Sequence, residues 1–253
     1  MIKPYLELGP LKLHYYGLII AAAIYIGLKL AQKRSAFYKI PAKLFDDLVI
    51  FTPLFLALIG GRAYHVLDKW SVYSQNPASI FYVSNGGLGI WGGLAGLIVG
   101  AYLVSKLKKI NFLSFMDVIS PSVLLAQALG RIGNFINQEG FGPPTQKPWG
   151  VYIDEIHRPI QYAASKFFHP TFFYEAIINL VFFIILVKIT KQAKKPGQMF
   201  GFYLISYSVG RFIVEFWRMD TWQIGEFKIA QVLSVIAFTS GVYLVLSVKK
   251  KGA

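Results

Sequence analysis

Seven apolar stretches follow one another along the chain, each close to the roughly 20 residues that an α-helix needs to cross a bilayer core. They cover approximately residues 13–31, 45–66, 87–105, 115–137, 171–189, 198–217 and 228–248. The third stretch is rich in glycine and the sixth carries charge, so these two are the weakest. The pattern predicts an all-α, polytopic membrane protein of about seven transmembrane helices, with residues 1–253 forming a single integral membrane domain.

Basic residues gather in every second connection between these stretches. On one side lie 15 of the 26 lysine and arginine residues, namely Lys29, Lys33, Arg34, Lys39, Lys43, Lys106, Lys108, Lys109, Lys188, Lys191, Lys194, Lys195, Lys249, Lys250 and Lys251. Because cytoplasmic loops carry such an excess, we expect the N-terminus outside and the C-terminus in the cytoplasm. The longest connection, residues 138–169, then lies on the outer side, and Trp149, Tyr152 and Tyr162 predict that it packs at the membrane interface.

The composition fits the same class of protein. Hydrophobic residues make up 55% of the chain, charged residues 15%, and the mean hydropathy is +0.50, which is too apolar for a soluble domain of this length. The formal net charge is +14, but the basic residues lie in short loops and not on one polar face. We therefore attribute the charge to topology and lipid contact, and expect no nucleic-acid partner. The chain has no cysteine, which excludes a disulfide framework or a thiol nucleophile of its own.

A polar stripe runs through the fourth apolar stretch. If the helix continues, Gln127, Arg131, Asn134 and Gln138 recur at i, i+4, i+7 and i+11, within about 60° of one helix face. An arginine at the centre of a bilayer helix costs about 2.5–3.5 kcal/mol, so we expect Arg131 to face a protein interior or a wet cavity, with a partner. The alternative is that Arg131 extends to a lipid headgroup, because it lies near the end of its stretch.

Charged residues also interrupt the sixth stretch. Arg211, Glu215 and Arg218 at i, i+4 and i+7 share one helix face and leave one net positive charge in an apolar helix. A structural ion pair accounts for two of the three, and the surplus arginine requires an anion from another helix or from a ligand. His169 and Pro170 open the fifth stretch, followed by a carboxylate at Glu175 that a helix-capping role explains as well as a site does.

Glycines cluster at the outer ends of the second and third stretches. Gly60 and Gly61 precede Arg62, and residues 85–94 read Asn-Gly-Gly-Leu-Gly-Ile-Trp-Gly-Gly-Leu. One explanation is close packing of two helices, and the other is the approach of backbone N–H groups to an anionic ligand.

Arginines of the second, fourth and sixth stretches are thus expected to point toward one cavity on the outer side. Guanidinium groups bind phosphate as bidentate forks, so the ligand that we infer is a phospholipid headgroup. The chain shows no zinc-protease motif, nucleophile elbow or nucleotide phosphate-binding loop. The residues alone indicate a membrane protein that handles an anionic lipid on the outer face of its membrane.

The stretch Gly130-Arg131-Ile132-Gly133-Asn134-Phe135-Ile136-Asn137-Gln138-Glu139, with Gly142 after it, closely resembles the signature of the prolipoprotein diacylglyceryl transferases. Further similarities occur in the expected order from residue 5 to about 240. They are His14-Tyr15-Tyr16-Gly17, Gly61-Arg62, His169-Pro170-Thr171 through Tyr174-Glu175, Arg211 through Arg218, and Gln231 with Ser234.

The resemblance implies a bacterial enzyme that moves the diacylglyceryl group of phosphatidylglycerol to the thiol of the lipobox cysteine in a prolipoprotein signal peptide, releasing glycerol 1-phosphate. It implies a multi-pass protein of the cytoplasmic (inner) membrane with its active site toward the outer side, and no cofactor or metal. The catalytic residues that it implies are Tyr16, Arg131, Asn134, Glu139, Arg211 and Glu215. The substrate-binding residues that it implies are Arg62, Arg131, Asn137, Gly142, His169, Arg211 and Arg218, with Arg131 and Arg211 on the phosphate.

One position departs from the family pattern. Many members have a histidine before the Gly-Gly-Leu of the third stretch, whereas this chain has Trp91. A free thiol has a pKa near 8.5, which nearby arginines lower, so we expect electrostatic activation of the thiol to dominate. Glu139 or Glu215 then serves as the proton acceptor. The four histidines, which are His14, His65, His157 and His169, are lesser candidates.

Three alternatives stay open at this point. A transporter or binding protein for an anionic lipid would also use intramembrane arginines, but the chain shows no inverted repeat. An enzyme of another lipid class would normally display paired histidines or a histidine–aspartate arrangement. An inactive homologue would explain Trp91, although the arginine pairs that are kept favour an active one.

Overall fold

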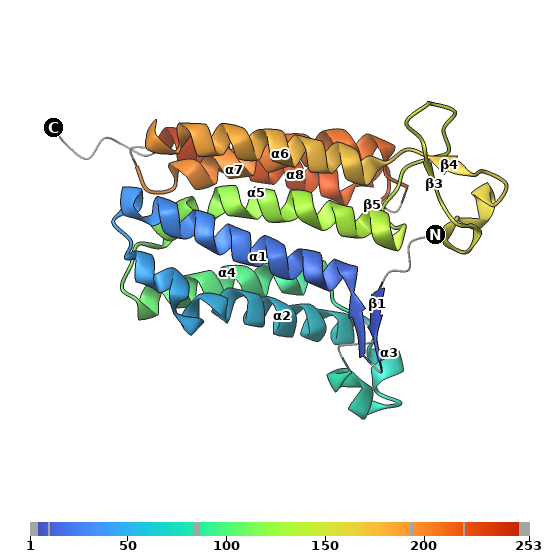
Figure 1. Ribbon diagram of the computed structural model, residues 1–253, viewed down its shortest axis with the longest axis horizontal. Helices are drawn as coiled ribbons and strands as arrows, with labels where there is room; N and C mark the ends of the chain where they lie inside the picture. The colour runs from blue at the N-terminus through green and yellow to red at the C-terminus, as the bar shows by residue number, and fades with distance from the viewer. Residues whose placement is uncertain (1–4, 10, 83–86, 193–194, 220, 248–253) are drawn as a thin grey trace. The chain divides into compact units, whose positions relative to one another are not determined.

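The computed structural model describes residues 5–9, 11–82, 87–192, 195–219 and 221–247. Some positions used above lie outside these ranges: Asn85, Gly86, Lys194, residues 249–251 and the last residue of the seventh stretch. The chain forms two compact units, one of residues 1–34 with 117–253 and one of residues 35–116 (Figure 1).

Helices make up most of the first unit, with short hairpins at their ends. Its helices are α1 (Tyr15–Arg34), most of α5 (Phe112–Asn137), α6 (Thr171–Ile189), α7 (Gln198–Val214) and α8 (Ile229–Ser247). Its hairpins pair β1 (Tyr5–Leu8) with β2 (Leu11–His14), β3 (Val151–Tyr152) with β4 (Phe167–Phe168), and β5 (Gln223–Ile224) with β6 (Phe227–Lys228). Short 3-10 turns are η6 (Glu155–His157), η7 (Ile160–Tyr162), η8 (Thr190–Gln192) and η9 (Glu215–Trp217).

The second unit contains α2 (Thr52–Asp68), α3 (Trp70–Tyr73) and α4 (Ile90–Leu107), with the first residues of α5. Its 3-10 turns are η1 (Ser35–Tyr38), η2 (Ala42–Asp46), η3 (Leu48–Phe51) and η4 (Pro77–Phe81). The second predicted stretch therefore begins as 3-10 turns and becomes α-helical only at Thr52. Asp47 separates the two turns, because its backbone is extended and its side chain accepts a hydrogen bond from Val49 N.

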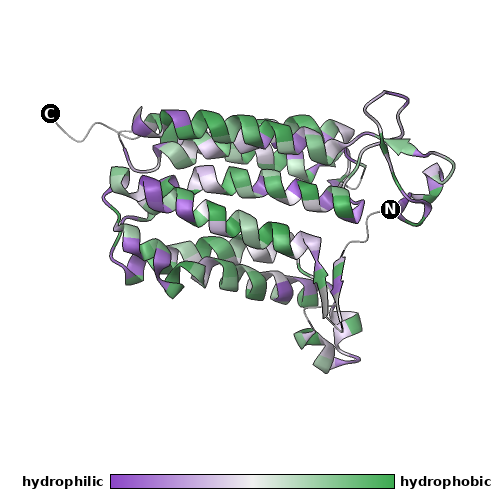
Figure 2. Ribbon diagram, viewed as in Figure 1, coloured by the Kyte–Doolittle hydropathy of each residue, from purple (hydrophilic) through white to green (hydrophobic). Residues whose placement is uncertain are grey.

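Within the described ranges, five helical segments are long and apolar enough to cross a membrane. They are Tyr15–Tyr38, Leu48–Asp68, Phe112–Asn137, Thr171–Ile189 and Ile229–Ser247. Trp91–Leu107 is a shorter apolar helix, and α7 has 17 residues. Each of the seven predicted stretches overlaps one of these helices, and Figure 2 shows hydrophobic residues along the lengths of α6 and α8. The structure is thus that of a mostly helical membrane protein.

Glycines allow the helices of each unit to pack closely. In the second unit, a Cβ atom on Gly60 or Gly92 would overlap the carbonyl oxygen of the other, so the glycines of α2 and α4 serve close packing. In the first unit, Gly201 and Gly241 do the same for α7 and α8, where a Cβ on Gly201 would lie 2.8 Å from Gly241 O. The packing explanation for the predicted glycine clusters thus holds for Gly60 and Gly92.

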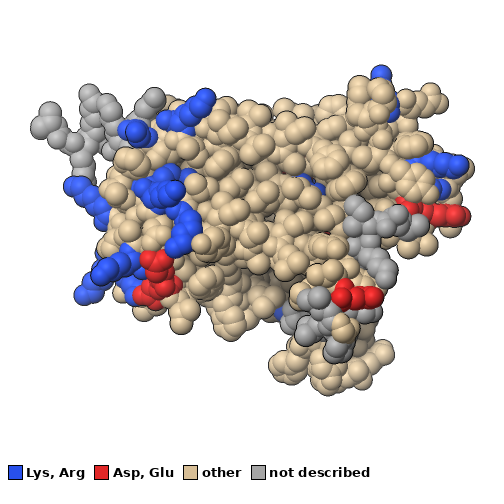
Figure 3. Space-filling view, in the orientation of Figure 1, with Lys and Arg blue, Asp and Glu red and all other residues tan. Residues whose placement is uncertain are grey.

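A buried aspartate ties the beginning of α7 to α5. Asp117 of α5 is 1% exposed, and its two carboxylate oxygens accept hydrogen bonds of 2.7 Å from Gly197 N and Phe200 N. These donors are among the N–H groups that a helix N-terminus leaves unpaired. The contact fixes α7 against α5 at the end of the unit where α6 ends. Figure 3 shows Lys and Arg gathered around that end, and few charged atoms along the flanks of the helices.

The connection over residues 138–169 folds onto its own small core at the other end. Phe141, Ile153, Phe168 and Phe172 are its buried centre. Gln138 begins this connection and is not part of the helical stripe predicted for it. Its φ of 54° takes the chain out of α5 after Asn137, and its side chain bonds with Asp154 at 2.9 Å.

Candidate active site

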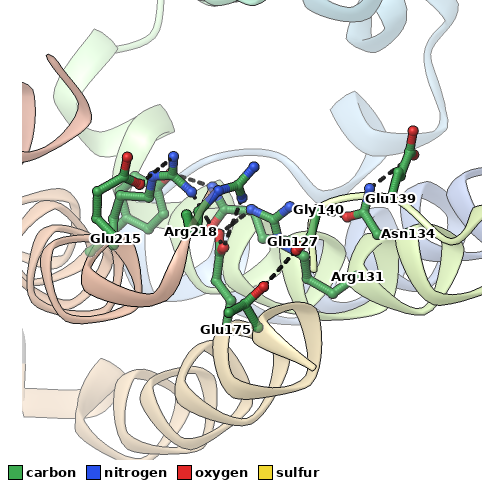
Figure 4. Close-up of polar contacts among 11 residues, drawn as sticks. Gln127, Arg131, Asn134, Glu139, Gly140, Glu175, Glu215 and Arg218 are labelled. Atoms are coloured by element: carbon green, nitrogen blue, oxygen red, sulfur yellow. Dashed lines mark hydrogen bonds and ion pairs between the residues drawn. The ribbon is translucent and has the colours of Figure 1, made fainter. Parts of the chain in front are cut away.

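Arg131 lies near the C-terminal end of α5 and points into the first unit. Its guanidinium pairs with the carboxylate of Glu175 on α6 and donates from Nη1 to Asn134 Oδ1 at 3.0 Å (Figure 4). The side chain is 23% exposed. Arg131 therefore has partners inside the protein, as the polar stripe predicted.

Glu175 is the residue on which the arginines converge. It lies in the second turn of α6 with its side chain 3% exposed. One oxygen, Oε1, pairs with Arg131, while Oε2 lies 3.5 Å from Arg211 Nη1 and 3.8 Å from Arg218 Nη1. Guanidinium groups from α5, from α7 and from the segment after η9 thus surround one buried carboxylate.

Arg211 and Glu215 form the second ion pair of the site. Arg211 Nη2 lies 2.8 Å from Glu215 Oε2, at the predicted i,i+4 spacing, and the Glu215 side chain is fully buried. The helix does not continue to Arg218, because α7 ends at Val214, η9 follows, and Arg218 is extended with φ −88° and ψ 138°. The prediction of one helix face for all three residues is therefore wrong. Arg218 nevertheless reaches the cluster through Glu175.

The contacting groups carry a surplus of positive charge. Arg131, Arg211 and Arg218 meet the carboxylates of Glu175 and Glu215, which leaves one net positive charge. Among the described residues, Glu175 Oε2, Glu215 Oε1 and Asn179 Nδ2 are buried without a hydrogen-bond partner. Buried polar atoms are rarely left unpaired, so the site has unused capacity for a polar ligand. No group of His, Asp or Glu side chains in the part of the chain that the structure describes is arranged to hold a metal ion.

A third carboxylate, that of Glu139, is held at the exposed edge of the cluster. Asn134 Nδ2 donates to Glu139 Oε1 at 3.0 Å, and Asn137 Nδ2 donates to the same oxygen at 3.4 Å. Asn134 accepts from Arg131 at the same time, so it connects the exposed Glu139 to the buried arginines. The predicted Asn134, Asn137 and Glu139 are thus brought together with Arg131.

A hydrogen-bonded group of three aromatic side chains lies at the start of α6. His169 Nδ1 is 2.9 Å from the Tyr174 hydroxyl, which also accepts a 2.9 Å hydrogen bond from Trp149 Nε1. His169 belongs to the predicted site, whereas Trp149 and Tyr174 were missing from it. The neighbouring Gly142 donates its N–H to His169 O at 2.8 Å, and a Cβ there would lie 2.6 Å from Trp217 O. Gly142 is required for this close approach of two chain segments.

Tyr16 packs on another face of α5. Its ring lies where a Cβ atom on Gly133 would be, so the first turn of α1 touches α5 beside Asn134. The Tyr16 side chain is 37% exposed. The structure therefore places the predicted Tyr16 against α5 at the level of the cluster.

Arg62 lies in the second unit and has different partners. Its guanidinium donates to the carbonyl oxygens of Ser79 at 2.6 Å, Ile80 at 2.8 Å and Gly87 at 3.0 Å, and it lies 5.1 Å from the centroid of the Tyr73 ring. Arg62 thus holds the connection between α2 and α4 by backbone contacts. Its predicted role in binding phosphate stays a prediction.

Comparisons with known proteins place the amino-acid sequence of this chain in one family. The model of the prolipoprotein diacylglyceryl transferase family matches residues 3–247. Proteins called phosphatidylglycerol–prolipoprotein diacylglyceryl transferase are similar over most of their length. The protein of Trichormus variabilis is 39% identical over 93% of this chain and 85% of its own, and that of Clostridium novyi is 38% identical over 95% and 93%. The protein of Bacillus cereus is 36% identical over 97% and 92%.

This chain belongs to the prolipoprotein diacylglyceryl transferase family. In this family member, Glu175 is the central residue that sequence reasoning left out of the site. The surplus arginine was expected to need an anion from another helix or from a ligand, and Glu175 is the only carboxylate in the fifth apolar stretch. That pairing was therefore the available signal. Trp91, the departure from the family pattern, lies in α4 of the second unit.

Proposed function

We propose that this chain transfers the sn-1,2-diacylglyceryl group of phosphatidylglycerol to the thiol of the lipobox cysteine of prolipoproteins and releases glycerol 1-phosphate. Family membership and the names of the relatives support this reaction. The observation that carries it is the cluster of two buried glutamates and three partly buried arginines, whose contacting groups leave one positive charge. The phosphodiester of phosphatidylglycerol carries one negative charge, which matches this surplus.

The orientation of the site in the membrane is part of the proposal. Two lysines mark one end of the first unit, Lys188 in the last turn of α6 and Lys191 in η8. The cluster lies toward the other ends of α5, α6 and α7. The positive-inside rule then puts the cluster on the outer side of a bacterial inner membrane. The same rule supports seven spans and an outside N-terminus. Trp149, Tyr152 and Tyr162 support an interfacial position for residues 138–169 of the one membrane domain.

The cluster would act on the departing phosphate. The thiol sulfur forms a bond to the terminal glycerol carbon, and the bond from that carbon to the phosphate ester oxygen breaks with its electron pair leaving on the phosphate. The phosphate charge grows from one negative charge toward two during this step. Arg131 and Arg211 therefore bind the transition state more strongly than the ground state, and this difference accelerates the reaction.

The other residues of the predicted site surround these two arginines in the proposal. Arg218 contributes through its contact with Glu175, and Asn134 orients Arg131. The residues proposed to lie around the headgroup and the reacting carbon are Tyr16, Asn134, Glu139, Gly142 and Glu215, while Asn137 and His169 are proposed to bind substrate.

The proton of the thiol goes to a carboxylate of the site. Glu139 is exposed and can pass the proton to water, while Glu215 is fully buried beside Arg211. We expect the arginines to lower the pKa of the bound thiol, so that only modest help from a base is needed. Rate profiles against pH for Glu139→Gln and Glu215→Gln separate the two carboxylates. Loss of the acidic limb in one variant identifies a dedicated base, and unchanged profiles in both would contradict a carboxylate acceptor.

The proposed reaction is tested by reconstituting the full chain with phosphatidylglycerol and a lipobox peptide. The peptide mass should rise by one diacylglyceryl group while an equal amount of glycerol phosphate is released. Arg131→Ala should abolish both, whereas Lys166→Ala, which removes an exposed positive charge of the outer connection, should leave both unchanged. A wild-type protein that binds the lipid but transfers nothing would contradict the proposal.

A further inference from the structure

A cavity of about 370 Å³ lies where α6 begins and α7 ends. Its apolar walls are formed by Ile178 of α6, by Ile213 and Val214 of α7 and by Trp217 of η9. The indole of Trp149 completes it from the outer connection. Pockets of this size and apolar character are typical of sites that hold part of a ligand.

This cavity shares its walls with the arginine cluster. Tyr174, Val214 and Trp217 line the cavity, and each is followed directly in the chain by a charged residue of the cluster, Glu175, Glu215 or Arg218. The same segments, α6 and the end of α7 with η9, thus present charge on one side and an apolar cavity on the adjacent side. A molecule in the cavity would lie beside the reacting groups.

One wall of the cavity is polar and its hydrogen bonds have a direction. The indole of Trp149 is only a donor, so the Tyr174 oxygen accepts from it at 2.9 Å. The remaining hydroxyl proton of Tyr174 is then available for His169 Nδ1, also at 2.9 Å. In that arrangement neutral His169 carries its own proton on Nε2. The wall therefore offers an N–H donor of the kind that binds a peptide carbonyl oxygen.

We infer that this cavity binds the acceptor peptide and holds an apolar side chain next to the cysteine. The inference rests on the proposed function, which supplies the peptide as second substrate. A peptide brings an apolar side chain for the hydrophobic walls and a carbonyl for His169, whereas a lipid alkyl chain brings no hydrogen-bonding group. An alkyl chain would leave the polar wall desolvated and unpaired, which costs free energy. Trp149 and His169 also come from the connection outside the helices, on the side from which a secreted peptide approaches.

The inference is tested with the full chain in phosphatidylglycerol vesicles and a series of acceptor peptides. The peptides carry alanine, leucine or tryptophan in turn at each position before the cysteine. Wild type should prefer leucine at one of these positions and reject tryptophan there. Trp149→Ala enlarges the cavity, so it should raise KM for the leucine peptide by about tenfold and accept the tryptophan peptide. KM for phosphatidylglycerol should not change.

Trp70→Ala is the matched control. Trp70 of α3 is 56% exposed and Trp149 is 55% exposed, so both substitutions remove a half-exposed indole. Tyr174→Phe is a second variant that keeps the ring and removes the hydroxyl between Trp149 and His169, and it should also raise the peptide KM. The inference is overturned if Trp149→Ala leaves the KM for the leucine peptide as Trp70→Ala does. It is also overturned if Trp149→Ala changes the KM for phosphatidylglycerols of different chain length and not the KM for the peptide. Absence of transfer in wild type with every peptide would instead refute the proposed function.

Discussion

Two arginines, Arg62 and Arg131, show how differently the same side chain is used in this protein. Arg62 in the second unit is 8% exposed and donates to the backbone carbonyls of Ser79, Ile80 and Gly87. Arg131 in the first unit pairs with Glu175, and through that carboxylate it meets two more arginines. Carbonyl dipoles neutralise the first charge locally, whereas the second belongs to a cluster with a positive surplus.

The difference indicates which arginine is available to a ligand. The contacts of Arg62 hold the chain between α2 and α4, and replacing them with a phosphate would free those carbonyls. The groups in contact around Glu175 carry one more positive than negative charge, so an anion improves their balance. We therefore expect Arg62 to affect stability and Arg131 to affect catalysis.

The largest effect on stability is expected for Glu175→Ala. This substitution leaves three guanidinium groups near one another with only Glu215 to balance them, and breaking a buried ion pair costs about 3–5 kcal/mol. The melting temperature in detergent micelles should fall strongly. The melting temperature should fall less in Glu175→Gln, because glutamine keeps a hydrogen-bond acceptor. Glu155→Ala, which removes an exposed glutamate of η6, is the control. Equal melting temperatures for Glu175→Ala and Glu155→Ala would refute the central position of Glu175.

A smaller effect on stability is expected for Arg62→Ala. The substitution leaves carbonyl oxygens without their donor, at a cost of about 1–3 kcal/mol for an unsatisfied buried group. The melting temperature should drop, while transfer per folded molecule stays near that of wild type. If the Arg62→Ala protein is fully stable but inactive, Arg62 binds substrate, and the contrast between Arg62 and Arg131 is wrong.

The smallest effect is expected for the exposed pair of Asp47 and Lys108 in the second unit. Asp47 precedes the apolar segment Leu48–Asp68, and the hydrogen bond from Lys108, with a further one from Val49 N, holds the pKa of its carboxyl below the ordinary value. The pair therefore stabilises the fold above the ordinary pKa of about 4 and loses this effect as the pH falls through the lowered pKa. Asp47→Asn should lower the melting temperature slightly at neutral pH and not at the acid end. If the difference in melting temperature between wild type and Asp47→Asn grows as the pH falls, the ionised Asp47 carboxylate does not stabilise the fold.

The sequence located the helices because each one coincides with a long run of apolar residues bounded by polar residues. The stretch at 171–189 coincides with α6, whereas the stretch at 45–66 begins in 3-10 turns. The helical spacing of polar residues gave a wrong prediction where the helix ends but polar residues continue at the same spacing. Gln138 and Arg218 continue the helical spacing in sequence, but a left-handed residue and a 3-10 turn redirect them.

The candidate site was predicted only in its separate parts for a similar reason. Helix spacing relates Arg211 to Glu215 within one element, and the 2.8 Å pair follows from it. No spacing relates Glu175 of α6 to Arg131 of α5, because that pairing depends on how two helices pack. Burial of charge provides the link, since an arginine inside a membrane protein requires a partner, either a carboxylate or backbone carbonyl groups.

The most direct test of the account is the single-turnover transfer rate of Arg131→Lys at saturating phosphatidylglycerol. Lysine keeps the positive charge and loses the planar fork that binds two phosphate oxygens. The account predicts that phosphatidylglycerol still binds and that the chemical step slows by about 10²-fold, as when one transition-state donor is removed. A single-turnover rate equal to that of wild type, with the lipid bound, would contradict the role of Arg131 in stabilising the departing phosphate.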